Sequence, residues 1–209
     1  MHGLIDDLLA DTSVPGVIGP NAVLQLIEAL KAAGLYDVSA PVFATAGVAD
    51  WLADPPEKMV DQRRVARLHQ ALRAVSSRQE GSALMADSGR RTADYILANR
   101  IPKPAQMLLK RLPARLAAMA FVPAIKAHSW TFAGTGAFTG QAGLPTVFTL
   151  TGNPLCAGEH ASAPVCTWHA AVFQRLFQVL VSPRARAVET ECEACGDPFC
   201  RFEVDWRKQ

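Results

Sequence analysis

The residue types best suited to chemistry are gathered near the end of this 209-residue chain. No cysteine occurs before Cys156, and all five cysteines then lie between Cys156 and Cys200. A Gly-Asp-Pro turn signal at 196–198 separates two segments rich in β-branched and aromatic residues, which predicts a β-hairpin. That hairpin places Cys192 roughly opposite Cys200, with Glu189 further back on its first strand. Thiols that converge with a carboxylate and a further thiol suit a tetrahedral Zn²⁺.

Other interpretations of the cysteines compete with a metal site. A disulfide framework is disfavoured because the count is odd and the chain is not a small secreted domain. Buried inert thiols are the plain alternative. The pair Cys192/Cys195 has the spacing of a redox motif, but it lies in the predicted hairpin and not at a helix N-terminus. The metal interpretation is favoured.

The order of residues in this segment resembles a known family signature. Glu189, Cys192, the Gly-Asp-Pro turn at 196–198 and Cys200, preceded by Cys166, resemble the C-terminal signature of the 4-vinyl reductase domain family. In its zinc-binding members one upstream cysteine, a glutamate and two hairpin cysteines hold the metal.

The resemblance implies a structural zinc and a ligand set. The set is Cys166, Glu189, Cys192 and Cys200. Cys156 and Cys195 are then spare thiols, with Cys195 the alternative fourth ligand. Residues three apart on a regular strand face opposite ways, so the strand is expected to twist or bulge near Glu191.

Length and composition limit the class of protein. Half of the residues are hydrophobic and the net charge is +2, which favours a single domain over 1–209 and gives no reason to expect a nucleic-acid partner. The longest apolar run, 116–125, is too short for a transmembrane segment and contains Pro123. The acidic start of the chain lacks the basic residues of an export signal, which predicts a cytoplasmic protein with free thiols.

Periodicity predicts an α+β fold, with a helical half over about 1–126 and an α+β part over about 127–206. The expected strands are an alternating segment at 127–133, a second at 146–150 and the hairpin, with glycines at 134–143 marking turns. The expected helices cover 4–10, 20–34, 39–52, 57–75, 81–100, 105–112, 114–126 and 167–181.

The resemblance extends to most of the chain. The segments 91–102 and 128–136 resemble the bacteriochlorophyll 4-vinyl reductase-type proteins of purple phototrophic bacteria. This resemblance implies helices packed on an antiparallel sheet around an enclosed ligand pocket. It also implies a magnesium-tetrapyrrole ligand of the divinyl protochlorophyllide or Mg-protoporphyrin type, and contact with other bacteriochlorophyll-synthesis enzymes. A peripheral position on the photosynthetic membrane and a homodimer are left open.

Candidate ligand contacts come from aromatic and imidazole side chains. His128, Trp130 and Phe132 alternate on one face of the expected strand and could offer an axial ligand and two flat rings. Ordinary core packing is the alternative for all three. His169 is expected on a helix surface, and His69 on a solvated face among arginines.

The sequence favours binding over catalysis. A vinyl reductase needs a source of hydride or electrons, but no dinucleotide fingerprint follows a predicted strand, and no catalytic residue is identified. A zinc with four protein ligands has no open position. An accessory or carrier protein for a magnesium tetrapyrrole is therefore favoured. A genuine 4-vinyl (8-vinyl) reductase with an external reductant is the alternative, and a small-ligand sensor module is a more remote one.

Overall fold

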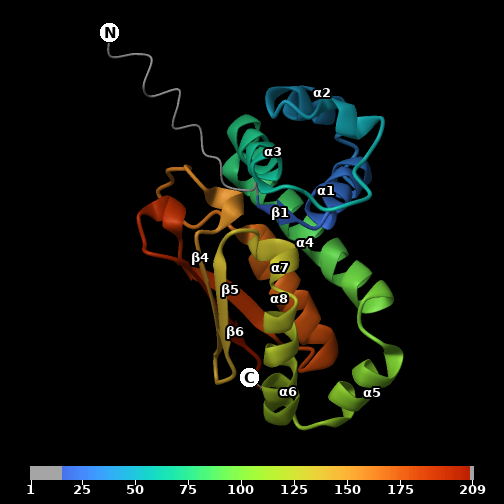
Figure 1. Cartoon of the computed structure of the whole chain (residues 1–209), viewed down its shortest axis with the longest axis vertical. Helices are drawn as coiled ribbons and strands as arrows, with labels where there is room; N and C mark the ends of the chain where they lie inside the picture. The colour runs from blue at the N-terminus through green and yellow to red at the C-terminus, as the bar shows by residue number, and fades with distance from the viewer. Residues whose placement is uncertain (1–15, 208–209) are drawn as a thin grey trace.

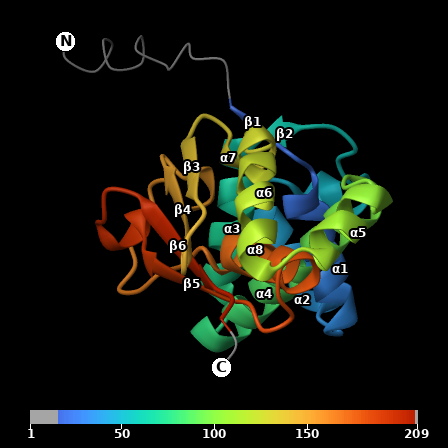
Figure 2. The same ribbon diagram turned by 90° about the horizontal axis from the view of Figure 1, so that it is seen from below.

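A layer of helices and a four-stranded sheet make up the described chain. The structure is a computed structural model that describes residues 16–207. Figure 2 shows the sheet on one side of the molecule and the helices on the other. The α+β class predicted from the sequence is confirmed.

Eight α-helices are present in the described residues, most of them close to the predicted positions (Figure 1). They are α1 Asn21–Ala32, α2 Tyr36–Thr45, α3 Gln62–Val75, α4 Arg78–Asn99, α5 Lys103–Arg111, α6 Ala114–Ala127, α7 Trp130–Ala133 and α8 Thr167–Leu180. Short 3-10 helices cover η2 Ala49–Leu52, η3 Pro154–Cys156 and η4 Glu193–Cys195. The helix expected at 4–10 lies outside the described residues.

The sheet is antiparallel, with strand order β3-β4-β6-β5. Its strands are β3 Ala137–Gln141, β4 Thr146–Thr151, β5 Arg186–Glu191 and β6 Cys200–Asp205. A separate two-stranded pair joins β1 Val17–Ile18 to β2 Val60–Asp61. In β6 the side chains alternate, so that Cys200, Phe202 and Val204 are buried.

Helix α8 is the central element because it is covered on both sides. Its buried side chains contact the sheet through Phe173, whose ring centroid lies 4.6 Å from that of Phe148 on β4. On its other side α8 packs closely on α4, where Gly89 leaves no room for a side chain. A Cβ at Gly89 would lie 2.5 Å from the carbonyl oxygen of Trp168.

The strand expected at 127–133 is wrong. The chain there ends α6 at Ala127 and forms the short helix α7. Side-chain hydrogen bonds of helical spacing stabilise this path: His128 Nδ1 lies 2.9 Å from the Ala124 oxygen, and Thr131 Oγ1 donates to the His128 oxygen. His128, Trp130 and Phe132 therefore do not share a strand face.

Two other segments differ from expectation. The helix expected over 39–52 is divided into α2 and η2, because Gly47 adopts a positive φ of 68°. The segment expected to hold only turns contains β3, which pairs with β4 along its whole length. Gly140 permits this close packing, since a Cβ there would lie 3.1 Å from the Phe148 ring.

The terminal hairpin and its irregularity are confirmed. β5 pairs with β6, and the register shifts between Glu189 and Glu191. Glu189 opposes Phe202 while Glu191 opposes Arg201, so one residue of β5 is extra. This bulge changes the alternation just before Cys192, as the spacing of the candidate ligands required.

No helix among residues 16–207 has both the length and the apolar character that crossing a membrane demands.

Replacing Gly89 should separate α4 from α8. We expect Gly89→Ala to lower the free energy of unfolding by about 1–3 kcal/mol, because the new methyl group overlaps backbone of α8. Gly81→Ala on the same helix is the control, since its Cβ would meet Ser76 Cβ at an ordinary 3.4 Å. The control should be neutral or stabilising by up to about 1 kcal/mol. Equal denaturation midpoints for the two variants would contradict this packing.

Candidate metal centre

The terminal hairpin supplies two sulfur atoms. Cys192 directly follows β5, and Cys200 is the first residue of β6. Gly196 closes the turn with a φ of 92°, a conformation that favours glycine. The Asp197 carboxylate accepts a hydrogen bond of 2.8 Å from the backbone N–H of Cys192. These local contacts hold both thiols on the inner side of the hairpin, where both are buried.

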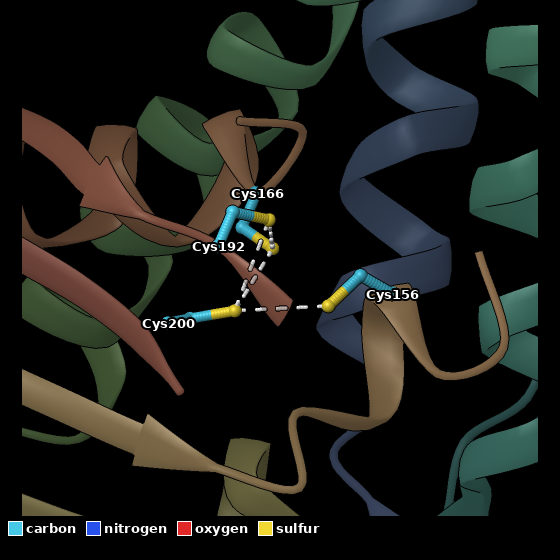
Figure 3. A group of neighbouring side chains, drawn as sticks. All are labelled: Cys156, Cys166, Cys192 and Cys200. Carbon is cyan, nitrogen blue, oxygen red and sulfur yellow. Dashed lines mark hydrogen bonds between the residues drawn. The ribbon is translucent and has the colours of Figure 1, made fainter. Parts of the chain in front are cut away.

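Two further sulfur atoms come from the connection between β4 and α8. Cys156 ends η3, and Cys166 immediately precedes α8. Figure 3 shows the side chains of Cys156, Cys166, Cys192 and Cys200 directed toward one another. We call these four residues the cysteine cluster. All four are buried, and their sulfur atoms lie within 4.8 Å of one another.

The cysteine cluster has the dimensions of a tetrahedral zinc site. Cys200 Sγ lies 3.7 Å from Cys156 Sγ, 3.8 Å from Cys166 Sγ and 4.0 Å from Cys192 Sγ. Cys166 Sγ and Cys192 Sγ are 3.9 Å apart. A tetrahedral ion with Zn–S bonds of about 2.3 Å sets its sulfur ligands about 3.8 Å apart. The donor set and its spacing therefore fit Zn²⁺ with four thiolates.

Hydrogen-bond donors surround the sulfur atoms. The buried Asn153 donates from Nδ2 to Cys166 Sγ at 3.1 Å and to Cys200 Sγ at 3.3 Å. The backbone N–H of Glu193 also reaches Cys200 Sγ, at 3.5 Å. The Glu193 carboxylate in turn accepts hydrogen bonds from the N–H groups of Gly152 and Asn153. Donors of this kind stabilise thiolate charge and orient metal ligands.

Glu189 lies beside the cysteine cluster. Its Oε2 accepts a 2.7 Å hydrogen bond from the backbone N–H of Cys166, while its buried Oε1 has no partner in the described residues. Burial, with the nearby charge of Cys192, raises the pKa of the Glu189 carboxyl to about 9. A bound cation would favour the ionised form.

The structure thus gathers three of the four expected ligands with one thiol that was expected to be spare. Cys166, Cys192 and Cys200 are in the cysteine cluster, and Cys156 joins them in place of Glu189. Cys195 is exposed and lies outside the cysteine cluster. Coordination by Glu189 stays a prediction, and Cys156 is now a competing fourth ligand.

The expected ligand contacts are dispersed. His128 is exposed at the end of α6, and Trp130 exposes 58% of its surface. Phe132 is half-buried and turns inward, where its ring contacts those of Phe138 and Phe173 with centroids 5.0 and 6.0 Å away. A role for these three residues in ligand binding stays a prediction.

A buried histidine beside the cysteine cluster was missed. His169 is fully buried, not on a helix surface, and neither ring nitrogen has a hydrogen-bond partner in the described residues. Its ring lies among Phe132, Trp168, Phe173 and Phe202, with centroids 5.0 to 6.4 Å away. Burial lowers the pKa of His169 to about 3, so the imidazole is neutral.

Helical spacing could have revealed this position. His169 precedes Val172 by three residues and Leu176 by seven, so it belongs to the apolar stripe of its helix. His69 is buried as well, not solvated, and its Nε2 lies 3.0 Å from the Ala22 carbonyl oxygen. Burial lowers the pKa of His69 to about 4. Of these two buried imidazoles, therefore, only that of His69 has a polar atom paired.

A hollow of about 340 Å³ lies near the cysteine cluster, between α3, α4 and the segment 159–167. Its lining includes Arg73, Glu159 and His160, with Arg73 and Glu159 forming an ion pair. This polar lining differs from the wide apolar slot that a tetrapyrrole needs. The enclosed pocket for such a ligand stays a prediction.

The fold and the site define a class of protein. The family model described as the vinyl-4-reductase (V-4-R) domain matches residues 146–205, which contain β4, α8, the hairpin and the cysteine cluster. The chain is also similar to the bacteriochlorophyll synthase 23 kDa chain of Cereibacter sphaeroides, with 46% identity over 187 residues that cover 90% of this chain and 89% of that one. It belongs to the family of the bacteriochlorophyll synthase 23 kDa chains.

Solved structures share the fold at low sequence identity. An H-NOX protein studied for heme distortion matches with a TM-score of 0.56 and 11% identity, covering 91% of this chain and 96% of that one. The phenol-responsive sensory domain of the transcription activator PoxR, solved with phenol, matches with a TM-score of 0.51 and 15% identity. That match covers 69% of this chain and 74% of the PoxR chain.

Metal analysis of single variants should identify the fourth ligand. We expect about one zinc per chain, lost in Cys192→Ser and Cys200→Ser together with much of the stability, because metal binding is coupled to folding. The geometry predicts that Cys156→Ser also loses zinc, whereas Glu189→Gln retains it. Cys195→Ser is the matched control, since its thiol lies outside the cysteine cluster. Loss from Glu189→Gln with retention in Cys156→Ser would instead establish the family's ligand set.

Proposed function

We propose that this protein serves bacteriochlorophyll biosynthesis as an accessory protein that binds a magnesium-tetrapyrrole intermediate and carries it to other enzymes of the synthesis. The observation that carries the proposal is the 46% identity to a bacteriochlorophyll synthase chain over nearly the full length of both proteins. The name of that relative associates it with a synthase, which supports partners among the same enzymes.

The fold supports a tetrapyrrole as the ligand. The H-NOX protein that shares this fold across 91% of the chain was studied for the distortion of its heme, which is also a metal tetrapyrrole. The PoxR domain was solved with phenol, a flat aromatic molecule. Folds of this shape therefore accommodate flat ligands in at least two proteins. This likeness concerns the fold, and it does not identify contact residues.

The surroundings of His169 supply a candidate contact point. A buried polar atom without a hydrogen bond costs about 1–3 kcal/mol, so both imidazole nitrogens lie in an unfavourable position in the ligand-free chain. A ligand whose central metal accepts a nitrogen lone pair would remove part of that cost. The low pKa of His169 keeps the imidazole neutral, as a metal ligand must be.

Access to His169 would lie past α7. Among the rings around His169, that of Phe132 is half-buried, whereas Trp168, Phe173 and Phe202 are buried. Helix α7 has one turn and ends at Gly134, whose φ is 57°. Displacement of Phe132 would open the aromatic cluster toward Trp130 and His128, which joins the residues expected from the sequence to His169.

The metal centre has a structural role in this proposal. Four thiolates complete the tetrahedral shell of a zinc ion, so such an ion has no position left to polarise a substrate. Binding and transfer of a pigment need no such position. The proposal therefore separates the metal centre, which holds the fold, from the aromatic cluster, which holds the ligand.

The decisive experiment mixes the purified protein with divinyl protochlorophyllide, with and without a nicotinamide reductant. We expect a shifted pigment spectrum and co-elution of pigment with protein, without conversion of the vinyl group to an ethyl group. Mass spectrometry of the extracted pigment measures conversion. Catalytic formation of the ethyl product would replace the carrier by the genuine 4-vinyl reductase, and a pigment that stays free would refute binding.

Two buried histidines allow a matched test of the contact point. In the ligand-free protein His169→Phe should be neutral or stabilising, because it removes unpaired polar atoms. His69→Phe should lower the free energy of unfolding by about 1–3 kcal/mol, because it leaves the Ala22 oxygen unpaired. Zinc protoporphyrin should show an axial-nitrogen spectrum with wild type and His69→Phe, but not with His169→Phe. An unchanged spectrum in His169→Phe would return the ligand site to the neighbourhood of His128.

A further inference from the structure

Helices α5 and α6 carry a concentration of exposed apolar side chains. Met107 and Leu108 on α5 expose 55% and 62% of their surface, and Leu116 and Met119 on α6 expose 48% and 54%. Figure 1 shows both helices and their connection at the lower end of the molecule. We call the exposed face of these two helices the α5–α6 surface.

Helix α6 is apolar on both of its faces. Its inner face buries five residues against the rest of the protein, namely Ala117, Ala118, Phe121, Val122 and Ile125. Its outer face is equally free of polar side chains between Arg115 and Lys126, because the exposed residues there are Leu116, Met119, Ala120, Pro123 and Ala124. A helix that is apolar all round is normally covered on all sides. The outer face of α6 lacks such cover within the described chain.

The charges around the α5–α6 surface have a single sign. The sequence has no acidic residue between Asp94 and Glu159. Its basic residues in that interval, all exposed, are Arg100, Lys103, Lys110, Arg111, Arg115 and Lys126. Among residues 16–207 no ion pair includes any of the six. The preceding Asp94 pairs with Arg175 of α8.

We infer that the α5–α6 surface docks on an anionic lipid membrane. Flexible apolar side chains flanked by lysine and arginine are the composition of helices that lie in a membrane interface. The apolar side chains would enter the acyl boundary, and the six cations would face lipid phosphates. Interfaces between proteins are instead depleted in lysine and enriched in aromatic residues, and the exposed α5–α6 residues include no aromatic ring.

The helices are suited to lie on a bilayer, not to cross it. A helix needs about 20 apolar residues to span the hydrocarbon core, and α6 has 14 residues in all, with Pro123 among them. Neither helix of the α5–α6 surface contributes to the cysteine cluster. The inference is therefore independent of the metal centre, and it goes beyond the proposed function without needing it.

Vesicle sedimentation of the zinc-loaded full-length protein tests this inference. We expect the protein to pellet with vesicles that contain phosphatidylglycerol, to bind weakly to pure phosphatidylcholine, and to be released at about 1 M salt, where charges are screened beyond about 3 Å. Neutralisation of one cation should weaken binding about fivefold, and Lys110→Gln combined with Arg111→Gln correspondingly more. Leu108→Ser with Met119→Ser should weaken binding at low salt as well.

Matched variants separate this surface from general stickiness. Val75→Ser removes an exposed apolar side chain at the end of α3, and Lys58→Gln removes an exposed cation, both outside α5 and α6. Both should bind vesicles like wild type, and all variants should keep the wild-type melting temperature. Equal binding by the α5–α6 variants and wild type would overturn the inference. So would a concentration-dependent dimer, in lipid-free solution, that Leu108→Ser dissociates, because the surface would then bind a second copy.

Discussion

Four buried sulfur atoms within 4.8 Å of one another impose the constraint on which the C-terminal half depends. Thiolates at this separation repel one another strongly, and neutral thiols cannot all find good donors and acceptors there. A divalent cation resolves both problems because it supplies the opposite charge at the centre. It then joins the end of β5, the start of β6, η3 and the N-terminus of α8, which are far apart in sequence. A small hairpin and a long connection are thereby fixed against the central helix.

The metal centre also determines where His169 lies. Cys166 immediately precedes α8, and His169 lies in the first turn of that helix, three residues later. Fixing Cys166 therefore fixes the position of the imidazole against Phe202 of the hairpin strand β6, with ring centroids 5.7 Å apart. Stored polar strain of this kind persists only where surrounding structure holds it. Removal of the metal should loosen the aromatic cluster even though the ion touches none of its rings.

The success of prediction from the sequence follows the range of the interactions involved. Helices such as α1, α6 and α8 were predicted because their apolar spacing is a local property. The hairpin and its bulge were predicted because Gly196 and the spacing of Glu189 to Cys192 are local as well. Alternation at His128, Trp130 and Phe132 failed because a five-residue pattern fits one helical turn as well as a strand.

What was missed depends on contacts across the fold. β3 contains Gly140, which is typical of a turn until the ring of Phe148 is known to fill the space beside it. Cys156 joins the cysteine cluster only because η3 returns the chain to β6, which no spacing within the hairpin reveals. The burial of His69 likewise depends on α1, where Ala22 supplies its hydrogen-bond acceptor.

The two proposals meet in the aromatic core. A tetrapyrrole is poorly soluble in water, so a carrier gains by receiving it from a membrane and not from solution. Phe121 of α6 contacts Phe177 of α8 with centroids 5.8 Å apart, and Phe177 contacts Phe148, which stacks near Phe173 beside His169. The inner face of the helix proposed to lie on lipid thus belongs to the same aromatic layer as the proposed ligand contact. Docking through the outer face of α6 would bring that layer to the membrane surface, so a pigment could pass from lipid to protein without crossing water.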